Sequence, residues 1–196
     1  DSGLARLRIA QLMVKEAKID PALEYLVDAA KSNPRDALMQ IGLGDLRVKM
    51  AQTMAQGYGS LYDQAETHYR QALALDASSV QARRGLVTAL IENGKPTAAL
   101  TAIRQLGQRT DFYGKLDYES ARAHQLLGRY KRALSLFSSL ARKGNAESAR
   151  FLGLMLLAGR GCEKDIPKAE NWLRQASASG DKTATRILSQ YAVLFK

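Results

Sequence analysis

Two segments of the chain repeat one another 34 positions apart: "IENGKPTAALTAI" (residues 91–103) and "QLLGRYKRALSLF" (residues 125–137). The matching pairs are Gly94 with Gly128, Ala99 with Ala133, and Ile103 with Phe137. A small residue lets two helices approach closely, and a large residue four positions later fills the remaining space. Glycine at the turn adopts a backbone conformation that a Cβ disfavours. The repetition therefore indicates tandem helical hairpins.

The same phase continues in both directions from this pair. "KEAKIDPALEYLVDAAKSNP" (residues 15–34) and "YDQAETHYRQALALD" (residues 62–76) carry equivalent small and large residues. These are Ala22, Leu26 and Ala29 in the first segment, and Ala65, Tyr69 and Ala72 in the second. Between Gly44 and Ala65 the chain is longer than the repeat requires. We therefore expect an insertion near residues 49–62 that lengthens one or both helices and their connection.

Small and large residues in this order resemble the tetratricopeptide repeat, a helix–turn–helix unit. From Gly144 onward, "GNAESARFLGLMLLAGRGCEKDIPKAENWLRQASASGDKTATRILS" is similar to the longer Sel1-like repeat. The resemblance implies that Gly159-x-Gly161 forms the hairpin loop, that Asp165 caps the second helix, and that Trp172 packs between helices. Ala169 takes the small-residue position of that helix.

The predicted fold class is all-α, a right-handed α-solenoid of about five stacked antiparallel helical hairpins. Residues 1–143 are expected to form four tetratricopeptide-like hairpins with the insertion near 49–62. Residues 144–196 are expected to form a Sel1-like repeat followed by a C-terminal capping helix.

Charge is unevenly distributed along the 196 residues, which carry a formal net charge of +10. Residues 1–98 contribute +1 and residues 99–196 contribute +9. A basic half favours an acidic partner or an anionic polymer, although a solvated basic surface gives the same composition. No run of about 18 apolar residues is present, so the sequence predicts no transmembrane segment. A single cysteine cannot form an internal disulfide bond or a zinc site.

The residue types that carry catalysis are not grouped in a productive pattern. His68 and His124 are the two histidines, and we interpret both as packing or surface residues. Cys162 is interpreted as a loop-packing thiol. The Gly-x-Gly at 159–161 has neither the spacing of a phosphate-binding loop nor the third glycine of a dinucleotide-binding loop. The sequence therefore predicts a non-enzymatic protein with no metal and no cofactor.

The tetratricopeptide resemblance implies that positions 2, 5, 9 and 12 of each first helix face a concave groove. The residues at these positions are Leu4, Leu7, Gln11 and Val14; Leu38, Ile41, Asp45 and Val48; Gln81, Arg84, Thr88 and Ile91; Lys115, Tyr118, Arg122 and Gln125; and Glu147, Arg150, Leu154 and Leu157. The candidate partner-binding residues are Arg84, Thr88, Lys115, Tyr118, Arg122, Arg150, Leu38 and Ile41. Some family members hold a C-terminal carboxylate in this groove, and Thr88 replaces the Asn of that clamp.

An apolar and basic groove predicts a scaffold or adaptor that binds an acidic or amphipathic segment of a protein partner. We expect Arg84, Arg122 and Arg150 to line one basic face. The resemblance implies a bacterial role in envelope, exopolysaccharide-export, pilus or secretion assembly, in the periplasm or on an outer-membrane lipoprotein rather than in the cytoplasm. The alternative is binding of a polyanion, RNA or an acidic polysaccharide, through the basic C-terminal half, although nucleic acid is not the favoured partner.

Overall fold

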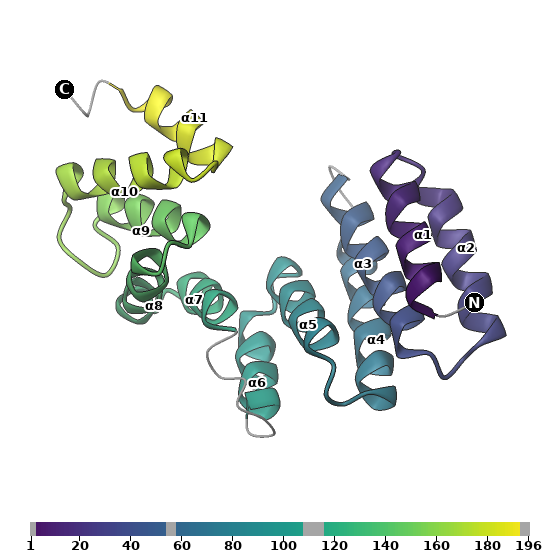
Figure 1. The fold of residues 1–196 in the computed structure, drawn as a ribbon. Coiled ribbons are helices and arrows are strands. Elements are labelled where there is room, and N and C mark those ends of the chain that lie inside the picture. Colours follow the sequence, from purple (N-terminus) through teal and green to yellow (C-terminus); the bar gives the residue numbers. More distant parts are fainter. Residues whose placement is uncertain (1–2, 54–57, 108–115, 193–196) are drawn as a thin grey trace. The chain divides into compact units, whose positions relative to one another are not determined.

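The computed structural model describes residues 3–53, 58–107 and 116–192, and all eleven elements found there are α-helices (Figure 1). They are α1 (Gly3–Lys15), α2 (Ile19–Ser32), α3 (Ala37–Thr53), α4 (Gly59–Leu75), α5 (Val80–Glu92), α6 (Pro96–Gly107), α7 (Asp117–Leu126), α8 (Tyr130–Arg142), α9 (Ala146–Ala158), α10 (Ile166–Ala178) and α11 (Lys182–Gln190). The all-α class of helical hairpins is as predicted. Within the described residues, no helix combines the length and the apolar character needed to cross a membrane.

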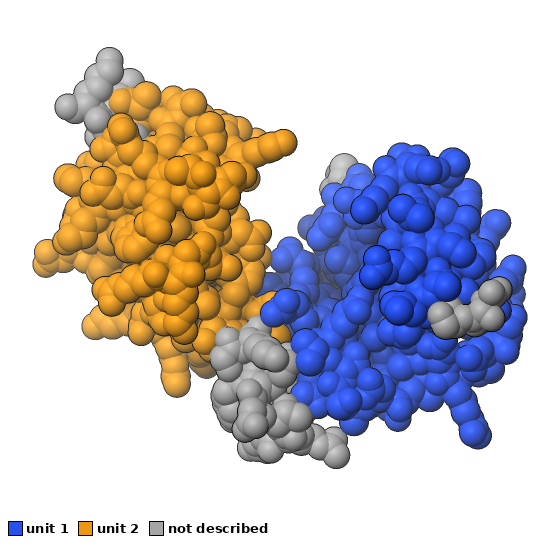
Figure 2. Space-filling model, in the orientation of Figure 1, with its two compact units in different colours: residues 1–102 blue, residues 103–196 orange. Residues whose placement is uncertain are grey.

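The helices form two compact units, residues 1–102 and residues 103–196, which Figure 2 shows in different colours. Helices α8 and α9 share one hydrophobic core in the second unit, so the chain has no break in packing at residue 143. The expected difference in repeat type on the two sides of that residue stays a prediction.

The repeated small residues lie where the sequence pattern placed them. Ala22, Ala65, Ala99, Ala133 and Ala169 each have 0% exposure. Four positions later, the large side chains of Leu26, Tyr69, Phe137 and Leu173 are also buried. Helices α2, α4, α8 and α10 therefore each bury a small–large stripe, because residues four apart in a helix lie on one face, whereas Ile103 of α6 is half-buried.

The insertion near residues 49–62 lengthens both helices of its hairpin. Helices α3 and α4 have 17 residues each, whereas α5 has 13. Tyr58 is exposed at the start of this hairpin's second helix, and Tyr62 is buried with its ring 6.0 Å from that of Tyr58. Residues 54–57 lie outside the described residues. Both helices have the greater length expected of an insertion, while the insertion itself stays a prediction.

Several turns share one hydrogen-bonding pattern in which a left-handed residue ends the helix. After Gly94, the Lys95 N–H donates to the Leu90 carbonyl at 2.8 Å, and after Gly128 the Arg129 N–H donates to the His124 carbonyl at 2.9 Å. The same pattern follows Ala17. Among the described residues, Ala17 is the one non-glycine residue with a positive φ, which is 62°. This geometry is the Schellman motif, in which glycine avoids the steric cost of the left-handed region.

We expect Ala17→Gly to raise the free energy of unfolding by about 0.5–1 kcal/mol, since it relieves the strained backbone at a turn that already exists. The opposite change, Gly94→Ala, is the matched control. A Cβ at Gly94 meets no atom within 4 Å, so its cost of about 1 kcal/mol is conformational. Urea unfolding measures the change in the free energy of unfolding for both variants. A destabilised Ala17→Gly protein would contradict the expectation.

Candidate functional site

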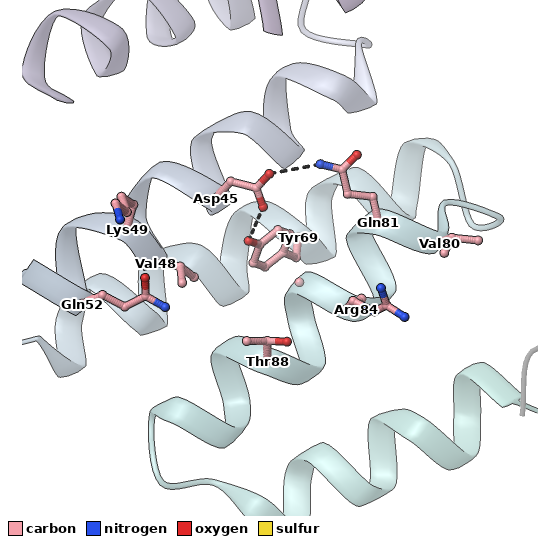
Figure 3. Close-up of a pocket in the computed structure, with 10 residues that line it drawn as sticks. Asp45, Val48, Lys49, Gln52, Tyr69, Val80, Gln81, Arg84 and Thr88 are labelled. Atoms are coloured by element: carbon pink, nitrogen blue, oxygen red, sulfur yellow. Dashed lines mark hydrogen bonds between the residues drawn. The ribbon is translucent and has the colours of Figure 1, made fainter. Parts of the chain in front are cut away.

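The main surface feature of the first unit is a pocket of about 540 Å³ between α3 and α5 (Figure 3). Its α3 side chains lie at i, i+3, i+4 and i+7, which is one face of a helix. Its lining residues are Asp45, Val48, Lys49 and Gln52 from α3, Tyr69 from α4, and Val80, Gln81, Arg84, Gly85 and Thr88 from α5.

A buried tyrosine organises the floor of this pocket. The Tyr69 ring packs against the two first helices, where a Cβ at Gly44 would lie 2.8 Å from the ring and one at Gly85 would overlap it. The Tyr69 hydroxyl donates to Asp45 Oδ1 at 2.7 Å, and Gln81 Nε2 donates to Asp45 Oδ2 at 3.1 Å. Glycine at both positions is thus a packing requirement, and the network links α3, α4 and α5 (Figure 3).

Burial changes the titration of both ends of this hydrogen bond. Desolvation raises the pKa of Asp45, and the hydrogen bonds from Tyr69 and Gln81 partly oppose that rise. Burial, together with the neighbouring Asp45 charge, raises the pKa of the Tyr69 hydroxyl, so Tyr69 stays protonated as the donor. The Asp45 carboxylate on α3 therefore joins α4 and α5 at the floor of the pocket.

A second, more apolar pocket of about 310 Å³ lies between α1 and α3. Leu7 and Leu26 pack here over Gly42, where a Cβ would lie 2.8 Å from each side chain. The lining residues are Leu7, Ala10, Gln11, Val14 and Lys15 from α1, Leu26 from α2, and Gly42, Asp45, Leu46 and Lys49 from α3. Because Asp45 and Lys49 line both pockets, the two pockets adjoin along α3, and together we call them the unit 1 groove.

The unit 1 groove combines apolar and basic side chains, and its α1–α3 pocket is the more apolar of the two. Its lining cations are Lys15, Lys49 and Arg84, and Asp45 is the one acid among the lining residues. Three cations and one acid give this lining a positive net charge. Such a surface can bury apolar side chains and bind carboxylates.

The groove includes some predicted residues and excludes others. Arg84 and Thr88 line it, together with the predicted inward positions Asp45, Val48 and Gln81. Leu38 is half-buried against the core of α1–α3. Ile41 is 1% exposed, which corrects its assignment to a partner-binding surface: its short apolar side chain packs inside, whereas Arg84 at the equivalent position of α5 is exposed. Lys115 lies outside the described residues.

Lys49 and Gln52 are groove residues that the sequence positions did not indicate. Gln52 lies in the last turn of α3, beyond the length of the 13-residue helix α5. The signal was available in the spacing, since both residues continue the face of Asp45 at i+4 and i+7.

In the second unit, the predicted residues Tyr118, Arg122 and Arg150 gather around Phe151. The guanidinium carbons of Arg122 and Arg150 lie 5.3 and 4.5 Å from the Phe151 ring centroid. Phe151 stacks on the buried Phe137 at 5.1 Å, and burial raises the pKa of the Tyr118 hydroxyl. Arg122 and Arg150 thus share one site, while Arg84 belongs to the other unit.

Arg150 also has a structural partner that limits its availability to a ligand. Its Nε donates to Asp181 Oδ2 at 2.7 Å, and the two side chains are 15% and 8% exposed. Asp181 Oδ1 accepts from the Ala184 N–H, so the same carboxylate caps α11. Burial alone would raise the pKa of Asp181, but the hydrogen bonds from Ala184 and Arg150 outweigh it and lower that pKa.

The family is decided by a comparison with family models. The tetratricopeptide repeat model matches residues 48–153, more than half of the chain. The chain belongs to the tetratricopeptide repeat family. Curated proteins give no sequence match.

Solved tetratricopeptide repeat structures share the fold at low sequence identity. Pseudomonas aeruginosa pilF is 15% identical with a TM-score of 0.74, covering 98% of this chain and 84% of pilF. TTC0263, a thermophilic TPR protein of Thermus thermophilus, is 19% identical with a TM-score of 0.72, covering 98% and 100%. YrrB, described as a TPR protein with an unusual peptide-binding site, is 17% identical with a TM-score of 0.60, covering 96% and 92%.

The tetratricopeptide pattern continues past the matched range into the segment that resembles a Sel1-like repeat. Gly159 ends α9 at φ 65°, and a Cβ at Gly161 would lie 2.6 Å from the Tyr130 carbonyl carbon. Asp165 caps α10 by accepting from the Lys168 N–H at 3.0 Å. Trp172 is half-buried against the core, and Ala169 lies within it. These geometries match the expected structural roles, whereas the Sel1-like assignment itself stays a prediction.

The described residues show no group of three or more metal-ligating side chains. His68 Nδ1 lies 2.9 Å from Gln40 Oε1, and His124 is buried on α7. Cys162 is half-buried in the turn before α10. Each of these three residues thus belongs to a different helix or turn, and the unit 1 groove remains the best-formed candidate site.

Proposed function

We propose that the chain is an interaction scaffold whose unit 1 groove binds an acidic or amphipathic segment of a partner protein. The observation that carries this proposal is that two adjoining pockets, which share Asp45 and Lys49, together offer apolar side chains and three cations. The tetratricopeptide fold supports a protein partner, and the described peptide-binding site of YrrB supports a peptide-like one.

The proposed segment runs along α1, α3 and α5. Apolar side chains enter the pocket at Leu7, Val14 and Leu46, and a carboxylate approaches Lys49 and Arg84. Guanidinium and carboxylate groups form short charge-assisted hydrogen bonds, which fix the orientation of the segment. No catalytic role is assigned to the groove, since the proposal needs binding alone.

We propose a bacterial envelope setting for this binding, in the periplasm or on an outer-membrane lipoprotein, such as pilus, export or secretion assembly. Support comes from two structural neighbours, P. aeruginosa pilF and PilW, which is described as a widely conserved type IV pilus biogenesis factor. Both are similar to this chain in fold alone, so the setting is tested separately by locating the protein in cell fractions.

The alternative function, polyanion binding, is favoured by one feature of the second unit. Residues 120–146 contain six Lys or Arg and no Asp or Glu. On α8, Ser135, Ser138, Ser139 and Arg142 line a shallow surface hollow together with Lys143. This surface offers cations and hydroxyl donors without an acid, which is the composition that binds phosphate or carboxylate polymers.

A charge-reversal pair separates the two functions. We expect Lys49→Glu/Arg84→Glu to weaken binding of the protein partner by about tenfold or more, because carboxylates would then face like charge. Arg35→Glu/Lys31→Glu is the matched control, since both residues are exposed near the α2–α3 connection, outside the groove.

The partner is first captured from the source lysate and identified, and synthetic peptides that cover it are then titrated by fluorescence anisotropy. Equal affinities of the groove variant and the control variant would overturn the groove. If the captured ligand is instead a polyanion, its binding should depend strongly on salt and be lost in Arg132→Glu/Arg142→Glu. That result would favour the polyanion function.

A further inference from the structure

Asp45 carries a negative charge that no cation among the described residues neutralises. It is half-buried on α3 and lines both pockets of the unit 1 groove. Its two hydrogen-bond donors, the Tyr69 hydroxyl and the Gln81 amide, are both uncharged. Asp45 forms no ion pair within the described part of the chain, although Lys49 follows four residues later on the same helix. Carboxylates removed from water are usually paired with a cation, because an isolated charge is costly to desolvate.

The Asp45 carboxylate retains the capacity to accept further hydrogen bonds. An ionised carboxylate has two oxygens with about four acceptor positions in total. The Tyr69 hydroxyl takes one position on Oδ1 at 2.7 Å, and the Gln81 amide takes one on Oδ2 at 3.1 Å (Figure 3). Burial raises the pKa of Asp45 by more than these two hydrogen bonds lower it, so the fold compensates the charge only in part. A ligand cation at this carboxylate would complete that compensation.

The pocket between α3 and α5 presents charges of both signs to a ligand. Lys49 on α3 and Arg84 on α5 are exposed, and Asp45 is the one acid of the lining. A segment whose charged residues are all acidic would place a carboxylate near Asp45 as well as near the cations. Two like charges in a partly desolvated groove repel one another more strongly than in bulk water. A segment of mixed charge is therefore the better electrostatic match.

We propose that Asp45 is a specificity-determining residue of the unit 1 groove, which selects a partner segment that carries a lysine or arginine side chain among its apolar and acidic residues. This selectivity rests on the proposed function, since it specifies the charges of the segment that the groove binds. The basic side chain donates to Asp45 where the two pockets adjoin, and carboxylates of the same segment approach Lys49 and Arg84. Repulsion between Asp45 and a carboxylate in that place excludes segments that are acidic throughout.

The variant that tests this role is Asp45→Asn, which removes the charge and keeps the shape of the side chain. Its amide oxygen can still accept from the Tyr69 hydroxyl, and its amide nitrogen can donate to Gln81 once the Gln81 amide is turned over. Asp28→Asn is the matched control, because Asp28 lies on α2 outside the groove lining with its side chain 76% exposed. Circular dichroism and urea unfolding establish that both variants are folded.

The probes are capped, fluorescein-labelled peptides of alternating leucine and glutamate, titrated against the full chain by fluorescence anisotropy. One peptide is acidic throughout, and in each of the others a lysine replaces one glutamate at a different position. We expect the best lysine peptide to bind the parent at least about tenfold more tightly than the all-acidic peptide. In Asp45→Asn this preference should fall to about twofold or less, whereas Asp28→Asn should keep it.

A parent protein that binds the all-acidic peptide as tightly as the best lysine peptide would overturn the proposal. So would an Asp45→Asn variant that keeps the parent's preference. The Lys49→Glu/Arg84→Glu variant distinguishes these results from a failure of the proposed function. If it bound every peptide as tightly as the parent, the unit 1 groove would not be the binding site. If it lost the peptides while Asp45→Asn kept the parent's preference, the groove would be the site and the selective role of Asp45 would be wrong.

Discussion

Tyr69→Ala is expected to lower the free energy of unfolding by about 3–5 kcal/mol, the range for deleting a buried aromatic side chain. The ring is 2% exposed and fits against Gly44 and Gly85, so neither helix can move in to fill the space without losing its other contacts. The variant also removes the hydroxyl that donates to Asp45.

Tyr69→Phe separates the ring from the hydroxyl. It keeps the packing and leaves Asp45 with the Gln81 hydrogen bond, so we expect a cost of about 1 kcal/mol. Urea unfolding followed by circular dichroism measures both variants. If Tyr69→Ala cost no more than Tyr69→Phe, the ring would not be what joins α3, α4 and α5.

Asp181→Ala is expected to cost about 3 kcal/mol. It removes the cap of α11, which contributes about 1 kcal/mol, and leaves Arg150 without its partner in a largely buried site. Asp181→Asn keeps a capping oxygen but loses the charge. Its smaller loss of unfolding free energy therefore measures the contribution of the ion pair with Arg150. Arg174→Ala is the exposed control, since its pair with Glu170 is 69% exposed on the arginine side.

The pH dependence of stability follows from the lowered pKa of Asp181. A carboxyl group whose folded pKa lies below its unfolded value contributes stability that is fully present above the unfolded pKa, which is about 3.9 for Asp. That contribution is lost as the pH falls through the folded pKa. The parent should therefore lose more stability than Asp181→Asn between about pH 5 and pH 3. Parallel loss in both proteins would contradict the assignment.

Sequence reasoning located the hairpins because the small–large stripe repeats in a fixed register. Ala99 and Ala133 share both a sequence position and complete burial. The same register located Arg84 and Thr88 in the groove, since residues at helical spacing share a face whatever the partner helix is.

The position of a residue in the repeat does not by itself predict whether its side chain is buried or exposed. Ile41 and Arg84 are equivalent in the repeat, yet one is buried and the other exposed, because burial depends on what each side chain can reach. The role of Arg150 was equally hidden. Its partner Asp181 lies 31 residues away, and an acid that caps a helix gives no sequence sign of its second hydrogen bond.

The lengthened hairpin of α3 and α4 shows how such a chain can acquire new specificity. Its extra turn adds Gln52 to the lining of the unit 1 groove, while the buried side chains of Ala65, Tyr69 and Ala72 keep their phase. An insertion at the tip of a hairpin thus changes the length of that hairpin without changing how the neighbouring hairpins pack. For engineering, residues 49–62 are the place to graft sequence when a wider contact area is wanted.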